Sequence, residues 1–324
     1  MLLAATVFLS AFLLFQVQPI IGKYILPWFG ATPGVWATAL LFFQLMLLGG
    51  YAYAHFIVSR LTWHQQAVLH TVLLALALIS LPITPTEALK PANADAPTLH
   101  ILHILTVTIG APYLLLSATG PLIQRWHAQL HPGRSTYRLY ALSNLGSLLA
   151  LLSYPLLVEP YFRLRSQTSS WSWGYVAFAV LCAASALIVY RSSRELDAQA
   201  AGQDAVHIGS GTVKGDDPTW ATTLLWLLLS ACGSGLLLAT TNQMSMDIAV
   251  VPFLWVLPLS IYLLTFILTF DNRRWYVRPL FVALLPLALS NALRLLYGGI
   301  DLGIVDQVLG YSLTLFICCM CCHG

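Results

Sequence analysis

Apolar runs of about 20 residues recur along the whole chain, and as helices each would cross a hydrocarbon core of roughly 30 Å. Of 324 residues, 58% are hydrophobic and only 8% are charged. An ordinary soluble domain carries roughly 25% charged residues, so a water-soluble fold is excluded. We therefore expect an all-α fold, a polytopic helical membrane protein whose first partner is the lipid bilayer.

Polar residues, prolines and glycines divide the apolar sequence into ten candidate transmembrane helices. They are 2–21, 35–58, 67–83, 101–123, 139–158, 174–190, 222–241, 248–270, 279–297 and 303–322. These spans predict a six-helix bundle over 1–190, a polar cytoplasmic linker over 191–218, and a second, incomplete bundle of about four helices over 219–324. The third and sixth spans are short for a membrane crossing.

Lysine and arginine set the expected orientation of the spans. With the N-terminus inside, ten basic residues fall in inside loops and five in outside loops, which agrees with the positive-inside rule. We expect both termini on the cytoplasmic side of a bacterial inner membrane. The net charge of +3 is spread over loops, so nucleic-acid binding has no support.

A short internal similarity links the ends of the first and fourth spans. The segment "PIIGKY" at 19–24 resembles "PLIQRW" at 121–126. In the expected topology these segments lie on opposite sides of the membrane, which predicts inverted three-helix repeats and a major-facilitator-like fold. The alternative is that two helices ending in a proline and a basic anchor look alike by chance.

Polar side chains inside the apolar runs are candidates for solute binding, because such residues usually face a bundle interior or a cavity. Pro19 frees a backbone carbonyl one turn earlier, which predicts a discontinuous helix end beside two glutamines. Alternatively, these glutamines only bind neighbouring helices, and the acid at 247 is a solvated helix N-terminal residue. The candidates are Gln16, Gln18, Lys23, Gln44, Asn144, Asp247 and Asn291.

The chain ends in "LFICCMCCHG", where Cys319, Cys322 and His323 form the C-x-x-C-H pattern of c-type haem attachment. Such haem is attached on the outer side of a bacterial membrane, whereas the expected topology places this end inside. We therefore expect buried small residues rather than a haem, metal or redox site. His100 and His103 share one helix face but lack a third ligand, so we expect an interfacial pair.

Six segments, taken together, resemble the membrane part of bacterial fused major-facilitator/spermidine-synthase-like proteins. They are "FLLFQVQPIIGKYILPWFGATPGVW", "LLFFQLMLLGGYAYAH", "PYLLLSATGPLIQRW", "YRLYALSNLGSLLALLSYPLLVEP", "DIAVVPFLWVLPLSIYLLTFILTF" and "CMCCHG". The resemblance implies a membrane bundle followed by a soluble spermidine-synthase-like domain on the cytoplasmic side. That transferase domain has no counterpart in these 324 residues, so no catalytic residue is carried over.

Two functions follow as hypotheses. The first is a membrane transport module for a small polar or cationic solute, based on the repeat, the linker and the buried polar groups. The second is a membrane anchor of a spermidine-synthase-like transferase, cut short before its catalytic domain. In both hypotheses this chain is not itself an enzyme, and we expect no metal and no cofactor.

Overall fold

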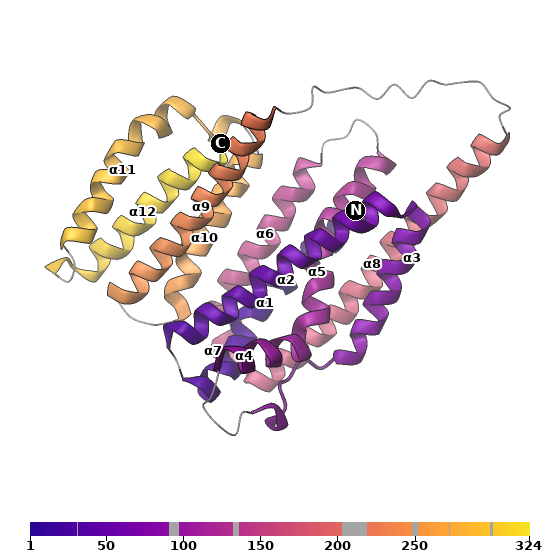
Figure 1. Ribbon diagram of the computed structural model, residues 1–324, viewed down its shortest axis with the longest axis horizontal. Helices are drawn as coiled ribbons and strands as arrows, with labels where there is room; N and C mark the ends of the chain where they lie inside the picture. Colours follow the sequence, from indigo (N-terminus) through magenta and orange to yellow (C-terminus); the bar gives the residue numbers. More distant parts are fainter. Residues whose placement is uncertain are drawn as a thin grey trace. The chain divides into compact units, whose positions relative to one another are not determined.

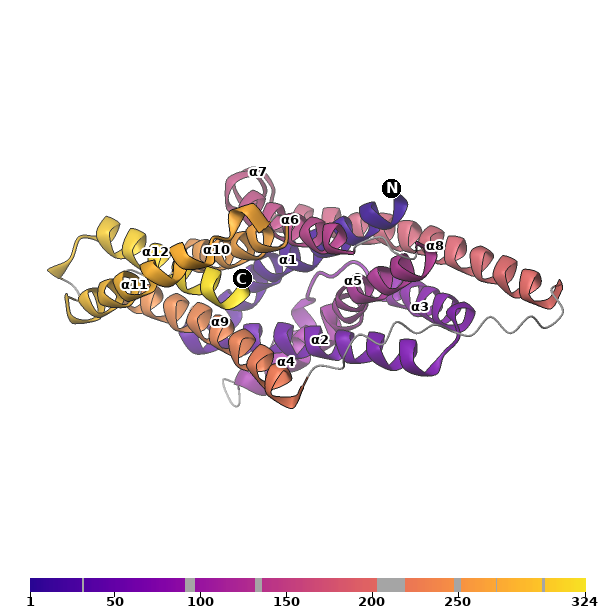
Figure 2. The ribbon, with the colours of Figure 1, turned by 90° about the horizontal axis from the view of Figure 1, so that it is seen from above.

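The structure, a computed structural model, describes residues 1–30, 32–90, 97–131, 136–202, 219–247, 252–271, 273–298 and 301–324. All the regular structure in these residues is helical (Figures 1 and 2). The chain forms two compact units, unit 1 over Met1–Ser193 and unit 2 over Arg194–Gly324.

Unit 1 begins with two long helices and continues through shorter and interrupted ones. Its elements are α1 (Leu2–Phe29), α2 (Pro33–Arg60), α3 (Trp63–Ala77), η1 (Leu78–Ser80), η2 (Glu87–Leu89), α4 (Pro97–Leu105), the π-helical η3 (Thr106–Gly110), α5 (Ala111–Leu130), α6 (Tyr137–Ser153), the π-helical η4 (Tyr154–Val158), α7 (Glu159–Tyr161) and α8 (Leu164–Gly202). Helices α4, η3 and α5 are one continuous helical stretch.

Within the described residues, eight helices are long and apolar enough to cross a membrane. They are Leu2–Phe29, Gly34–Arg60, Pro97–Leu130, Tyr137–Tyr161, Leu164–Ser192, Trp220–Met244, Arg278–Gly298 and Ile304–His323. Helices satisfy their own backbone hydrogen bonds, which is why they can be surrounded by lipid. The sequence-based expectation of an all-α, multi-pass membrane protein is confirmed at this level.

The other two predicted spans are not among these eight helices. Span 67–83 falls on α3, which has 15 residues, and on the 3-10 turn η1 that follows it. Span 248–270 overlaps α10, a helix of 20 residues. The ten-span topology therefore stays a prediction.

Unit 1 is held by close helix crossings. The most extensive contacts join α1 to α6 and α2 to α5, with α1 also packed on α5. Two glycines allow the backbones to approach: a Cβ on Gly50 would lie 2.7 Å from the Leu114 carbonyl oxygen, and one on Gly146 would lie 2.7 Å from that of Phe8. Close backbone approach through small residues is a common basis of helix association in membranes.

Unit 2 is built around its last helix. It contains α9 (Trp220–Asp247), α10 (Pro252–Asp271), η5 (Arg273–Trp275), α11 (Arg278–Gly298) and α12 (Ile304–His323), and α12 packs on α9, α10 and α11 (Figure 1). The N-terminal half of α9 exposes large apolar side chains in succession, including Leu225, Trp226 and Leu227. Lipid is the natural environment for such a surface.

Two adjacent cysteines of α12 face different neighbours. Cys321 contacts the Phe281 carbonyl oxygen of α11 at 3.5 Å, whereas Cys322 lies within hydrogen-bonding distance of Cys232 on α9. Both are free thiols in the structure. We expect oxidation by copper phenanthroline to join Cys232 to Cys322 as a disulfide, because the two thiols interact across facing helices.

The cross-link is measured by mass spectrometry of the digested protein. A Cys322→Ser variant should lose the cross-link, and a Cys321→Ser variant should keep it as the matched control. A cross-link that depends on Cys321 would contradict the packing of α12 against α9.

Candidate functional site

The candidate site of unit 1 is the middle of α1 around Pro19, which we call the Pro19 segment (residues 13–23). Contrary to the predicted helix end, α1 continues through Pro19 as far as Phe29. The proline still removes one backbone hydrogen bond, because it has no N–H to offer the carbonyl of Phe15. Neighbouring side chains supply hydrogen bonds to this part of α1, which is how membrane helices tolerate proline.

Gln18 makes the first contact of the segment. Its Nε2 donates to the Tyr113 hydroxyl of α5 at 3.2 Å, and both side chains are buried, with 7% and 1% exposed. The Tyr113 ring also packs against Phe43 of α2, with ring centroids 5.0 Å apart. One buried amide thus joins α1 to α5 inside an otherwise apolar core.

Two aromatic side chains bind backbone carbonyls of the same segment. Trp171 of α8 donates its Nε1–H to the Leu13 carbonyl at 2.8 Å. The Tyr154 hydroxyl of η4 lies 3.5 Å from the Pro19 carbonyl oxygen and 3.3 Å from Gln167 Oε1, so its one proton serves either acceptor. The Pro19 segment is therefore surrounded by hydrogen-bonding groups from three other elements.

An ion pair closes one end of the segment. Lys23 Nζ and a Glu159 carboxylate oxygen are 2.5 Å apart, and the two side chains are 34% and 36% exposed. A partly exposed pair of this kind contributes at most about 1 kcal/mol to stability. The ion pair joins α1 to Glu159, the first residue of α7, directly after η4.

Two π-helical segments lie next to the groups that contact the Pro19 segment. η3 ends three residues before Tyr113, and η4 begins with Tyr154. Pro112 and Pro155 explain the wide turns, because each removes an ordinary helical hydrogen bond. Such π-turns occur frequently at functional sites, where they re-aim side chains.

The predicted site residues do not form one cluster. Gln16 is half-buried on α1, whereas Gln44 is exposed on α2 and lies outside the buried polar contacts. Asn144 of α6 has a buried Nδ2 without a hydrogen-bond partner among the described residues. Asn291 belongs to unit 2, where its Nδ2 donates to the Gly310 carbonyl and to Thr314 Oγ1, each at 3.0 Å.

Asp247 is the last residue of α9, and its side chain lies outside the described part of the structure. His100 and His103 are exposed on α4. No group of three or more histidine, cysteine, aspartate or glutamate side chains fit to hold a metal ion occurs among the described residues.

The C-x-x-C-H residues lie in the last turns of α12. His323 Nδ1 is 3.0 Å from Thr265 Oγ1 of α10, and its ring stacks on Phe266 with a centroid distance of 3.8 Å. Cys319 is fully buried. This histidine packs α12 against α10.

Sequence reasoning missed several polar residues of unit 1, namely Tyr113, Tyr154, Gln167 and His70. Tyrosines in membrane helices suggest interfacial anchors, so their buried hydroxyls gave no signal. His70 did carry a usable signal, since an ionisable residue in an apolar run is a functional hypothesis by default.

The eight long apolar helices define the class: this is a multi-pass helical membrane protein. Comparison of the chain with protein-family models, with curated proteins and with solved structures gives no match.

Proposed function

We propose that the chain is a membrane transport module for a small polar or cationic solute, like the membrane half of the fused spermidine-synthase-like proteins that it resembles. The observation that carries the proposal is the Pro19 segment, where buried Gln18 and Tyr113 meet beside a proline inside a membrane helix. Polar side chains at membrane depth usually face a bundle interior or a cavity and mark solute pathways.

The packing of unit 1 supports an inverted repeat. In such a repeat the first three predicted spans correspond to the next three, so α1 corresponds to α5 and α2 corresponds to α6. The α1–α6 contact then corresponds to the α2–α5 contact. These are the two most extensive contacts of the unit. In each, a glycine of one helix meets the backbone of its partner, Gly50 against α5 and Gly146 against α1.

The corresponding prolines agree with this repeat. Pro19 lies inside α1 and Pro121 lies inside α5. Together with the basic-residue bias of the loops, the repeat favours a major-facilitator-like bundle in a bacterial inner membrane, with both termini cytoplasmic. That orientation leaves the cytoplasmic face available to a soluble spermidine-synthase-like domain.

The direct test is solute flux into liposomes containing the purified chain. Radiolabelled putrescine serves as a small dication and glycerol as a neutral polar solute. We expect faster putrescine entry than in protein-free liposomes, since a transport module for a small cationic solute supplies a path that the bilayer lacks. Entry equal to that of protein-free liposomes for both solutes would contradict transport and favour the membrane-anchor function.

A further inference from the structure

His70 lies wholly inside unit 1, with 0% of its surface exposed. Its Nδ1 is 3.4 Å from the Tyr53 hydroxyl of α2, and its Nε2 is 3.2 Å from Thr119 Oγ1 of α5. The Tyr53 and His70 rings also stack, with centroids 5.9 Å apart. One imidazole therefore joins three helices, α2, α3 and α5.

One arrangement of protons satisfies all of these hydrogen bonds. In it the Thr119 hydroxyl donates its one proton to the Leu115 carbonyl at 2.7 Å. Its oxygen accepts from the Nε2–H of His70, and the neutral ring has Nδ1 as the acceptor for the Tyr53 hydroxyl. A further proton has one place to bind, the Nδ1 lone pair, after the Tyr53 hydroxyl turns away.

The surroundings of the ring favour its neutral form. The titratable groups around it are the Tyr53 phenol of α2 and the Cys182 thiol of α8, which lies within hydrogen-bonding distance of Thr119. η1, also packed on α3, carries no titratable side chain. Among the described residues no carboxylate forms an ion pair with this imidazole, and a buried charge without a partner is costly.

A second buried polar group of unit 1, on α8, is linked to the same cysteine. Tyr175 of α8 is fully buried, and its hydroxyl has no hydrogen-bond partner among the described residues. This hydroxyl interacts electrostatically with Cys182, as does that of Tyr53. Buried polar groups are normally paired, so this hydroxyl has the capacity for one more hydrogen bond close to Cys182.

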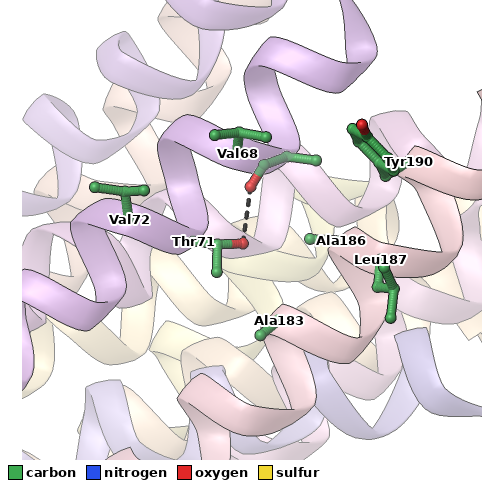
Figure 3. A pocket seen from close by; sticks show the side chains of 8 residues that line it. Val68, Thr71, Val72, Ala183, Ala186, Leu187 and Tyr190 are labelled. Atoms are coloured by element: carbon green, nitrogen blue, oxygen red, sulfur yellow. Dashed lines mark hydrogen bonds between the residues drawn. The ribbon is translucent and has the colours of Figure 1, made fainter.

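A groove lies between the helices that carry His70 and Cys182. A groove of about 320 Å³ separates α3 from α8 (Figure 3). Its walls include Ala67 and Thr71, one turn before and one residue after His70, and Ala183, the neighbour of Cys182. The groove therefore runs along the two helices that carry the buried imidazole and its neighbour Cys182.

We propose that His70 is the proton-binding residue that couples solute movement to a proton gradient. The imidazole is neutral while enclosed, gains one proton at Nδ1 when the bundle opens to one side, and releases it from Nδ1 to the other side. No other bond forms or breaks. This inference rests on the transport function proposed above and adds its coupling ion, H⁺.

The test uses liposomes containing the full chain, with putrescine as the solute and the pH indicator pyranine entrapped. In His70→Gln, the glutamine amide can form both hydrogen bonds of the imidazole, but it cannot bind the additional proton. We expect putrescine accumulation driven by a pH gradient to fall about tenfold, while putrescine exchange at equal pH stays within about twofold of the parent chain. Unchanged gradient-driven accumulation in His70→Gln would overturn the proposal.

Two further variants separate coupling from structure. His103→Gln, at an exposed histidine of α4, is the matched control and should behave as the parent chain. Tyr53→Phe removes the hydroxyl that stabilises the neutral ring, so the pH midpoint of accumulation should move to higher pH. An unmoved midpoint would argue that the imidazole does not titrate during transport.

Proton entry without solute distinguishes failure of this inference from failure of the proposed function. A potassium diffusion potential drives protons into the liposomes, and pyranine records the rate. If neither putrescine nor glycerol enters the liposomes, the proposed transport function is wrong. Slower proton entry in His70→Gln than in the parent chain would still support the proton-binding role of His70. Equal proton entry in both chains under that condition contradicts it.

Discussion

Gly50→Ala is expected to destabilise unit 1 by about 2 kcal/mol, the usual cost of overpacking a well-packed interior. The added Cβ would clash with Ser117 Oγ and would lie 2.7 Å from the Leu114 carbonyl oxygen and 3.0 Å from the Ala118 nitrogen. The serine side chain can rotate, but the two backbone atoms cannot move without separating α2 from α5.

The measurement is thermal unfolding of the detergent-solubilised protein, where we expect a melting temperature lower by about 5 °C. Gly49→Ala is the matched control, since its Cβ would lie at an ordinary 3.7 Å from a Leu114 methyl carbon. Equal melting temperatures for the two variants would contradict the close α2–α5 crossing.

Gln18→Leu is expected to reduce putrescine flux about tenfold in the liposome assay. The substitution keeps the side-chain volume but removes the donor to the Tyr113 hydroxyl and leaves that buried group unpaired, which costs about 1–3 kcal/mol. Because the Pro19 segment carries the proposed function, this loss should appear in transport as well as in stability.

Gln44→Leu provides the matched control for the glutamine at position 18. Gln44 is exposed on α2, so its replacement should leave flux within about twofold of the parent chain, as is usual for surface substitutions. A larger loss of flux in Gln44→Leu than in Gln18→Leu would place the solute path away from the Pro19 segment.

These two glutamines show the limit of reading polar residues from the sequence. Both glutamines lie in apolar runs, so the sequence predicts an interior position for each, and only the packing of the helices distinguishes them. Gln18 is buried because α1 lies among α5, α6 and α8, whereas Gln44 lies on a face of α2 that no described helix covers. Asn291 likewise looked like a binding residue, but its hydrogen bonds to Gly310 and Thr314 are contacts between α11 and α12.

The sequence by itself determined the class of this protein, because a helix about 20 residues long that is nearly free of charge has only lipid or a bundle interior as its environment. It also located the proline in α1 and its glutamine neighbours. Only the tertiary structure decided which side chains meet, since partners such as Gln18 and Tyr113, or His70 and Thr119, lie 95 and 49 residues apart in the chain. Hydropathy reports how deeply a residue is placed in the membrane, whereas a hydrogen bond depends on the rotation and crossing of two helices, which interhelical packing fixes.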